Sequence, residues 1–191
     1  MRPPRMQVEK NWSPFVYGGQ LHLSYSLQPH VVLRCAWSGG RCEVAHNTSN
    51  TFLQTYVTLG QGLRGGTPYA RLSDGSMLAA LHVKDGAHAP SLYGTLLYTI
   101  DGAPPFRVRS LSPKICISER QIELSISPRC ALQYIVGLAV DEARNLALVS
   151  LGEMDRRMKV AALPLARTLA LARTHMLHDA EVAESDCVAW G

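Results

Sequence analysis

The stretch PFVYGGQLHLSYS (residues 14–26), followed by VVLRC (residues 31–35), decides the fold. It reads as an apolar strand, a tight turn, a second strand and, after a short break, a third strand. A Gly-Gly pair between two apolar runs, here Gly18-Gly19, is a strong signal for a β-hairpin. The opening segment therefore predicts consecutive antiparallel strands.

The same pattern occurs twice more along the chain. The second copy is PYARLSDGSMLAALH (68–82) with GTLLYTI (94–100), and the third is VGLAVDEARNLALVSLG (136–152) with MKVAAL (158–163). Tyr25, His82 and Gly152 hold equivalent places, so the copies are 57 and 70 residues apart. A period of about 40–50 residues or more, with about four strands per copy, is typical of β-propeller blades. The repeat predicts an all-β fold, a partial β-propeller of about three blades.

The rest of the chain sets the expected boundaries. We expect one domain over residues 1–175, with blades near residues 8–60, 61–127 and 128–165. The segment after Pro164 is rich in helix formers, which predicts a C-terminal helix at 165–177 that caps the last blade. Residues 178–191 form a C-terminal tail without a functional interpretation.

Turns and a connector are also expected from local composition. Asp74-Gly75 predicts a second hairpin, and residues 141–145 predict a third. The connector after the first copy is polar and Gly-rich, and Leu53 to Leu59 is expected to be a strand within it. These signals support short strands from about Trp12 to Pro164.

Composition excludes several classes of function. A hydrophobic content of 47% with 18% charged residues is ordinary for a globular protein. The net charge of +4 is modest and the arginines are scattered, so we expect no nucleic-acid partner, which normally needs a basic stripe. No window approaches the roughly 20 apolar residues of a membrane span, so none is expected. The sequence does not indicate a compartment.

The cysteines give no sign of a metal centre. The chain has five cysteines, an odd number, and none belongs to a CxxC pair: Cys35, Cys42, Cys116, Cys130 and Cys187. No metal site and no cofactor are therefore expected, and the cysteines are interpreted as buried or surface free thiols. Two sequons, at Asn11 and Asn47, do not fix the compartment, because such triplets are common by chance.

Four polar clusters near expected strand ends could carry chemistry, and each has a plain structural alternative. Lys10 and Asn11 come just before a buried strand, or form a solvated turn. Arg64 precedes two glycines that would let the backbone approach a ligand, although Gly-Gly before Thr-Pro is also a good turn. His82 ends an apolar strand, where a structural histidine is more common than a catalytic one. Asp155 lies just past a strand end, or in a polar turn.

Taken in order, these clusters resemble the mannoside phosphorylase group, glycoside hydrolase family 130, and related propeller domains associated with glycosyltransferases. The resemblance spans roughly Val8 to Leu171 and rests on the order of short motifs. They are Lys10-Asn11 before Pro14-Phe15, Gly65-Gly-Thr-Pro leading to His82, Tyr93 with Leu96-Leu-Tyr-Thr-Ile and Pro104-Pro105, Tyr134-Ile-Val-Gly-Leu, and Ser150-Leu-Gly-Glu-Met-Asp before Lys159-Val-Ala-Ala-Leu-Pro-Leu.

The resemblance implies a five-bladed propeller of which this chain is the C-terminal part, acting on a glycosidic bond. It implies a carbohydrate or glycan substrate, with inorganic phosphate as a further partner. Lys10, Asn11, Arg64, His82 and Asp155 are then expected to face the sugar or phosphate at the propeller axis.

Departures from the family pattern leave an alternative open. Leu151 stands where the pattern prefers an aromatic residue, and Met154 where it prefers Asn or a small residue. The family's general acid is an Asp in a blade that would precede Met1, so the catalytic residue stays unassigned and this chain alone is expected to be inactive. The alternative is a non-catalytic sugar-binding or scaffold propeller. Because three blades do not close a propeller, we also expect the isolated chain to associate.

Overall fold

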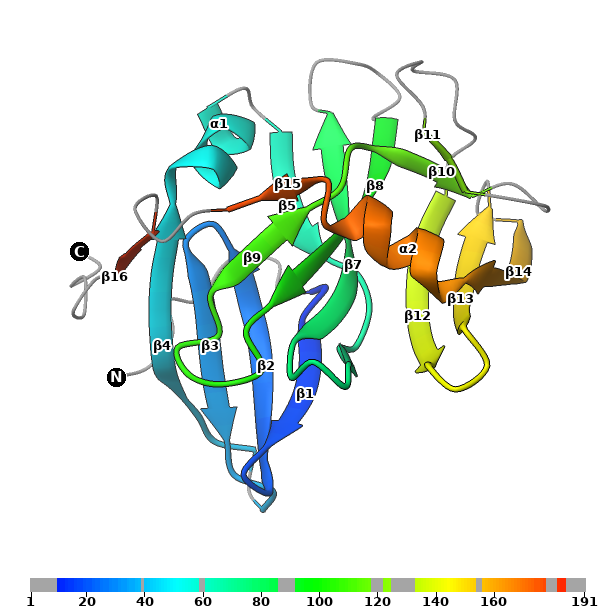
Figure 1. The fold of residues 1–191 in the computed structure, drawn as a ribbon. Helices are drawn as coiled ribbons and strands as arrows, with labels where there is room; N and C mark the ends of the chain where they lie inside the picture. Colours follow the sequence, from blue (N-terminus) through cyan, green and yellow to red (C-terminus); the bar gives the residue numbers. More distant parts are fainter. Residues whose placement is uncertain are drawn as a thin grey trace.

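The computed structural model describes residues 10–38, 40–58, 61–85, 92–117, 122–124, 133–153, 156–177 and 182–184. Within these residues the chain is mostly β, in three antiparallel sheets that do not close on one another, with two short helices (Figure 1). The all-β prediction is therefore confirmed.

The first sheet is a simple meander in which each strand pairs with the next one along the chain. A fifth strand from near the C-terminus pairs antiparallel with the fourth. In order, the strands are β1 (Ser13–Tyr17), β2 (Gln20–Leu27), β3 (His30–Cys35), β4 (Cys42–Asn50) and β16 (Val182–Glu184).

The second sheet is centred on two long, fully paired strands, β7 (Met77–Asp85) and β8 (Leu92–Ile100). Shorter strands extend it on both sides. They are β5 (Gln61–Gly65), β6 (Ala70–Arg71), β9 (Val108–Leu111), β10 (Ile115–Ile117), β11 (Ile122–Leu124) and β15 (His175–Met176).

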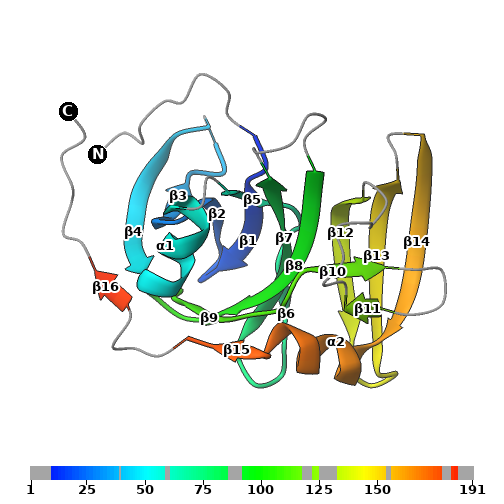
Figure 2. The same ribbon diagram turned by 90° about the horizontal axis from the view of Figure 1, so that it is seen from above.

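The third sheet has three strands in chain order: β12 (Gln133–Asp141), β13 (Leu146–Glu153) and β14 (Arg157–Pro164). Figure 2, seen from above, shows the three sheets side by side, with the second between the other two. The expected turns are confirmed, since Gly18-Gly19 joins β1 to β2, Asp74-Gly75 joins β6 to β7, and residues 142–145 join β12 to β13.

Two apolar cores hold the sheets together, and the second sheet contributes to both because its side chains alternate between its two faces. The core between the first two sheets includes Phe15, Leu27, Val32, Met77, Leu81, Tyr98 and Phe106. The core between the second and third sheets includes Leu78, Ala80, Leu97, Ile135, Val149, Leu151 and Leu163.

Helix α1 (Thr51–Thr58) replaces a predicted strand, so the expectation of a strand at Leu53 to Leu59 was wrong. The cause is the residue before the helix. The Asn50 side-chain oxygen accepts hydrogen bonds from the backbone N–H groups of Phe52 (2.9 Å) and Leu53 (3.2 Å). An asparagine in this position caps a helix N-terminus by satisfying donors that otherwise lack partners.

Helix α2 (Leu165–Ala172) begins where a C-terminal helix was predicted but is shorter, because His175–Met176 forms β15 instead. It packs against β8, β9, β13 and β14, so it covers the junction of the second and third sheets. The segment then continues along one side of the molecule to β15 on the second sheet and β16 on the first (Figure 2). One C-terminal segment thus contacts all three sheets.

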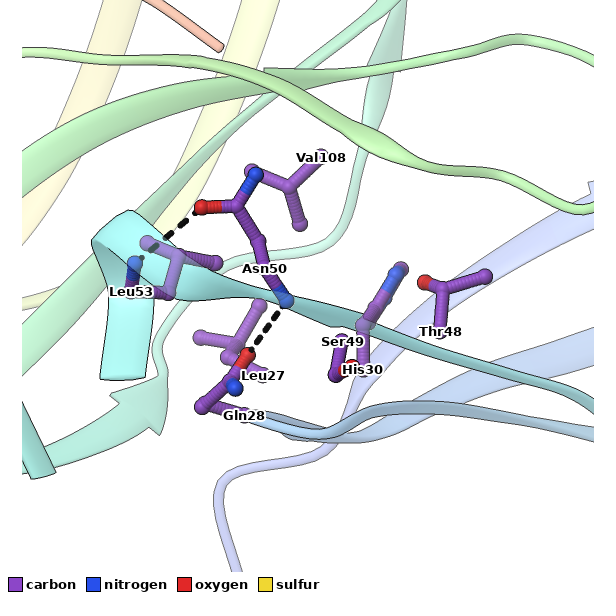
Figure 3. A pocket seen from close by; sticks show the side chains of 8 residues that line it. All are labelled: Leu27, Gln28, His30, Thr48, Ser49, Asn50, Leu53 and Val108. Atoms are coloured by element: carbon purple, nitrogen blue, oxygen red, sulfur yellow. Dashed lines mark hydrogen bonds between the residues drawn. The ribbon is translucent and has the colours of Figure 1, made fainter. Parts of the chain in front are cut away.

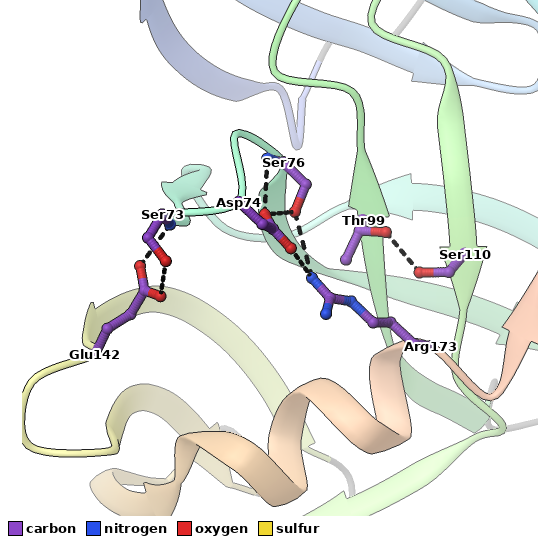
Figure 4. A network of polar contacts seen from close by, with 7 residues as sticks. All are labelled: Ser73, Asp74, Ser76, Thr99, Ser110, Glu142 and Arg173. Carbon is purple, nitrogen blue, oxygen red and sulfur yellow. Dashed lines mark hydrogen bonds and ion pairs between the residues drawn. The ribbon is translucent and has the colours of Figure 1, made fainter.

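A polar network fixes the turns of the second and third sheets to each other (Figure 4). The Glu142 carboxylate accepts hydrogen bonds from the Ser73 backbone N–H and hydroxyl, both at 2.6 Å. The Arg173 guanidinium, just after α2, pairs with Asp74 at 2.5 Å. These contacts join the sheets at the turn end, opposite the end where β7 and β13 finish.

The prediction of free thiols was wrong. Cys35 and Cys42 form a disulfide between neighbouring residues of β3 and β4, and Cys116 is disulfide-bonded as well. The spacing of Cys35 and Cys42 carried no CxxC signal, because cross-strand partners in a hairpin can be any short distance apart in sequence. Disulfides form and persist mainly in oxidising compartments.

The Cys35–Cys42 disulfide gives a stability prediction. Replacing both cysteines by alanine is expected to lower the free energy of unfolding by about 2–3 kcal/mol, because the bridge restricts the unfolded chain. Urea unfolding of the double variant and the oxidised wild type measures this difference. Equal midpoints for the two proteins would show that the hairpin gains nothing from the bridge.

Candidate functional site

A row of three side chains crosses the second sheet on the face toward the third sheet. Arg64 on β5, His82 on β7 and Thr95 on β8 are directly opposite one another in the strand register. Directly opposite residues of antiparallel strands share a face. Arg64 is exposed, whereas His82 and Thr95 are buried, so the row runs from solvent into the junction between the sheets.

His82 is enclosed by the first strand of the third sheet. The rings of His82 and Tyr134 stack with centroids 3.8 Å apart, and His82 Nε2 accepts a hydrogen bond from the Ile135 backbone N–H at 3.0 Å. Burial lowers the pKa of His82 to about 4, against the opposing effect of hydrogen bonds with the backbone of Gly65 and Ile135. The imidazole is therefore neutral near pH 7 and acts as a packing surface for Tyr134.

Asn11 brings the first sheet into the same cluster. The Tyr134 hydroxyl donates a hydrogen bond of 2.7 Å to Asn11 Oδ1, although the two residues are 123 positions apart. Asn11 has a φ of 63°, a left-handed conformation that asparagine tolerates better than most residues. Residues next to all three sheets therefore meet around the Tyr134 ring.

The two glycines after Arg64 allow this close meeting. A Cβ on Gly65 would overlap the Asn11 carbonyl oxygen and lie 2.9 Å from Ser13 Oγ. A Cβ on Gly66 would lie 2.8 Å from His82 Cε1. Both are closer than real Cβ contacts, so the space beside Asn11 and His82 requires residues without side chains here.

The structure places the five residues singled out from the sequence in different situations. Asn11 and His82 both contact Tyr134, and Arg64 lies beside His82 with its side chain exposed. Lys10 is exposed and adjoins Asn11 along the chain. His82 has no exposed surface, so it does not contact a ligand as expected. It supports the Tyr134 ring from below instead. Asp155 lies outside the described residues.

Tyr134 is the residue that reasoning from sequence did not single out. It entered only as part of a strand motif, because nothing in its neighbourhood indicates that β12 packs on β7. The cross-strand partner of Tyr134 is Gly152, and the next residue, Glu153, is ion-paired with Lys159 at 2.8 Å. Its carboxylate is thus already engaged by a cation.

A polar hollow between the first two sheets is a weaker candidate (Figure 3). It is lined by Leu27, Gln28, His30, Thr48, Ser49, Asn50, Leu53 and Val108. Its polar groups hold the fold together: Gln28 Oε1 accepts from the Asn50 backbone N–H at 3.1 Å, and His30 Nε2 lies 2.9 Å from Ser24 Oγ. The walls leave no space for a water molecule, so the hollow does not form a ligand site.

The cluster around Tyr134 offers a neutral amide, a phenol hydroxyl and an adjacent exposed guanidinium. Such groups bind hydroxyls and anions by hydrogen bonding. In the part of the chain that the structure describes, no three His, Cys, Asp or Glu side chains come close enough to hold a metal ion. Among the described helices, neither is long and apolar enough to cross a membrane.

Comparison with known proteins adds no assignment, since no protein-family model matches the chain and no curated protein matches it at a significant level.

Proposed function

We propose that this chain is a carbohydrate-active domain with propeller-type packing of its sheets, and that the cluster around Tyr134 is its sugar-binding site. The observation that carries the proposal is the convergence of all three sheets on that one ring. Tyr134 is hydrogen-bonded to Asn11, is stacked on His82, and lies across the junction from the row that begins at Arg64.

The arrangement of the sheets supports the propeller part of the proposal. Each sheet contains an up-and-down meander, and the apolar faces of neighbouring sheets pack on one another in chain order. The equivalent residues of the sequence repeat each lie on a middle strand of a meander. They are Tyr25 on β2, His82 on β7 and Gly152 on β13. Propeller blades pack in this way, and their ligands bind near the inner strands.

The chemistry of the cluster supports a sugar. Asn11 and Tyr134 can donate and accept hydrogen bonds with hydroxyls, and the exposed Arg64 and Lys10 side chains favour a ligand that is anionic or is used together with phosphate. In a complete active site these groups would hold the sugar while an acid protonates the leaving oxygen of the glycosidic bond.

A non-catalytic sugar-binding role is the second candidate, and one observation favours it. Glu153, the described carboxylate next to the partner of Tyr134, is ion-paired with Lys159. A carboxylate oxygen already engaged by a lysine is not available to contact the leaving oxygen of a glycosidic bond. Under this alternative the chain binds a glycan without cleaving it.

Titration calorimetry with mannose, mannobiose, other disaccharides and inorganic phosphate tests the proposal. We expect Arg64→Ala to weaken binding by roughly tenfold or more, because hydrogen bonds to a charged group contribute about 1.5–3 kcal/mol. Arg144→Ala is the matched control, since Arg144 is exposed at the β12–β13 turn, at the opposite end of the third sheet.

Two results would contradict the proposal. One is the absence of binding to any of these ligands by the folded wild-type chain. The other is unchanged binding in Arg64→Ala together with unchanged binding in Tyr134→Phe, which removes the hydroxyl that donates to Asn11. Hydrolysis or phosphorolysis of a mannoside by the isolated chain would separate the enzyme from the non-catalytic alternative.

A further inference from the structure

The third sheet has an open apolar face. Its inner face is buried against the second sheet, with Ala147, Val149 and Leu151 all at most 2% exposed. The opposite face carries Met158 at 87% exposed, Val160 at 72% and Leu148 at 41%. Side chains of this kind are rarely left together on the surface of a monomer unless they form an interaction site.

Strand register places these exposed side chains on one continuous surface. Leu148 on β13 is opposite Ala139 on β12 and Ala162 on β14, and Ser150 is opposite Val160. Met158 is opposite Gly152 in the next row. We call this surface the outer face of the third sheet, and its central rows contain no charged side chain: Ala139, Leu148, Ser150, Met158, Val160 and Ala162.

We propose that the outer face of the third sheet is a self-association surface that packs against the same face of a second copy of this chain. The protein already uses this mode of packing twice, because its sheets bury apolar faces against each other in both cores. The central rows of this face have no ionic feature that selects a charged partner, and they match another apolar sheet face.

We expect two identical faces to pair, because the apolar side chains on the outward face of the first sheet, at the other end of the molecule, are buried. On the outward face of the first sheet, Tyr25, Val31, Leu33 and Cys35 are between 2% and 7% exposed. This face therefore offers a second copy less exposed apolar surface than the outer face of the third sheet does. Contact between two outer faces of the third sheet gives a closed, twofold-symmetric dimer rather than an open chain of copies.

The size of the face sets the expected strength. Three strands about 4.8 Å apart and about 26 Å long cover roughly 370 Å² per copy. Stable interfaces usually bury about 1,200–2,000 Å² in total, so this contact lies in the weak range. A reversible, concentration-dependent dimer is expected.

Sedimentation equilibrium and light scattering of the full chain from about 10 μM to 1 mM test the proposal, a range suited to weak interfaces. We expect a monomer–dimer equilibrium in the wild type and at least a tenfold weaker dimer in Val160→Lys and in Met158→Lys. Both side chains are exposed, so the monomers should still fold, which far-UV circular dichroism checks. Val16→Lys on β1 is the matched control, because Val16 is 53% exposed away from this face, and it should dimerise like the wild type.

A single monomer across the concentration range would overturn the proposal. Dimers or larger assemblies of unchanged strength in both lysine variants would also overturn it, because association would then involve another surface such as a free strand edge.

Discussion

Acidification from pH 7 to pH 5 is expected to lower the free energy of unfolding by about 4 kcal/mol, because two histidines are buried in their neutral form. Burial lowers the pKa of His82 to about 4, and it lowers the pKa of His30 to about 4, with a further contribution from nearby His46. In the unfolded chain both imidazoles titrate near 6.5.

The sign follows from proton binding. Between pH 6.5 and 4 the unfolded chain binds protons that the folded chain excludes, so stability falls as pH falls through this window. Each histidine contributes about 2 kcal/mol of this loss at pH 5. The lowered pKa values of Glu43 and Asp74, caused first by hydrogen bonds with Arg34 and Ser76, matter only at lower pH.

Urea unfolding at pH 7.5, 6.5, 5.5 and 5.0 measures the effect. His82→Gln and His30→Gln should each remove about half of the pH dependence, whatever they do to stability at pH 7.5. His175→Gln is the control, because it removes a histidine from an exposed position on β15. A wild-type stability that changes by less than about 1 kcal/mol over this range would contradict the burial of neutral histidines.

Gly65→Ala is expected to destabilise the fold by about 2–3 kcal/mol and to abolish sugar binding, because the added Cβ overlaps the Asn11 carbonyl oxygen. The obstructing atom belongs to the backbone, so the segment at Asn11 must move as a whole. That movement separates Asn11 from the Tyr134 hydroxyl and opens the meeting point of the three sheets.

Gly62→Ala is the matched control for this variant. Gly62 lies on the same strand, and the nearest atom to its added Cβ is Arg64 Nε at 3.8 Å, an ordinary contact. Thermal unfolding and calorimetry of both variants compare stability and binding. If Gly65→Ala were as stable as Gly62→Ala and bound sugar equally well, the close packing of Gly65 on Asn11 would matter neither for stability nor for binding.

Reasoning from sequence succeeded where the cause is local. Gly18-Gly19, Asp74-Gly75 and residues 141–145 mark turns because glycine and asparagine adopt conformations that other residues avoid. The repeat built on these turns predicted strands in three groups, and the structure has three antiparallel sheets.

The errors have physical causes that a single sequence does not display. Asn50 caps α1, but a short apolar segment fits a strand and a helix equally well until the cap is recognised. The Cys35–Cys42 bond follows from the β3–β4 register, which depends on the turn between the strands. Tyr134 joins Asn11 and His82 only because the third sheet packs on the second, a long-range contact with no local signal.

The most direct test of the sugar site is a titration of the ¹⁵N-labelled chain with mannobiose, followed by amide chemical shifts. We expect saturable shifts with one dissociation constant at Asn11, Arg64, Gly65, Gly66 and Tyr134, which lie in or next to all three sheets. Amides around His30 and Asn50, in the polar hollow between the first two sheets, should not move. Shifts confined to that hollow, or no saturable shift anywhere in the spectrum, would contradict the account.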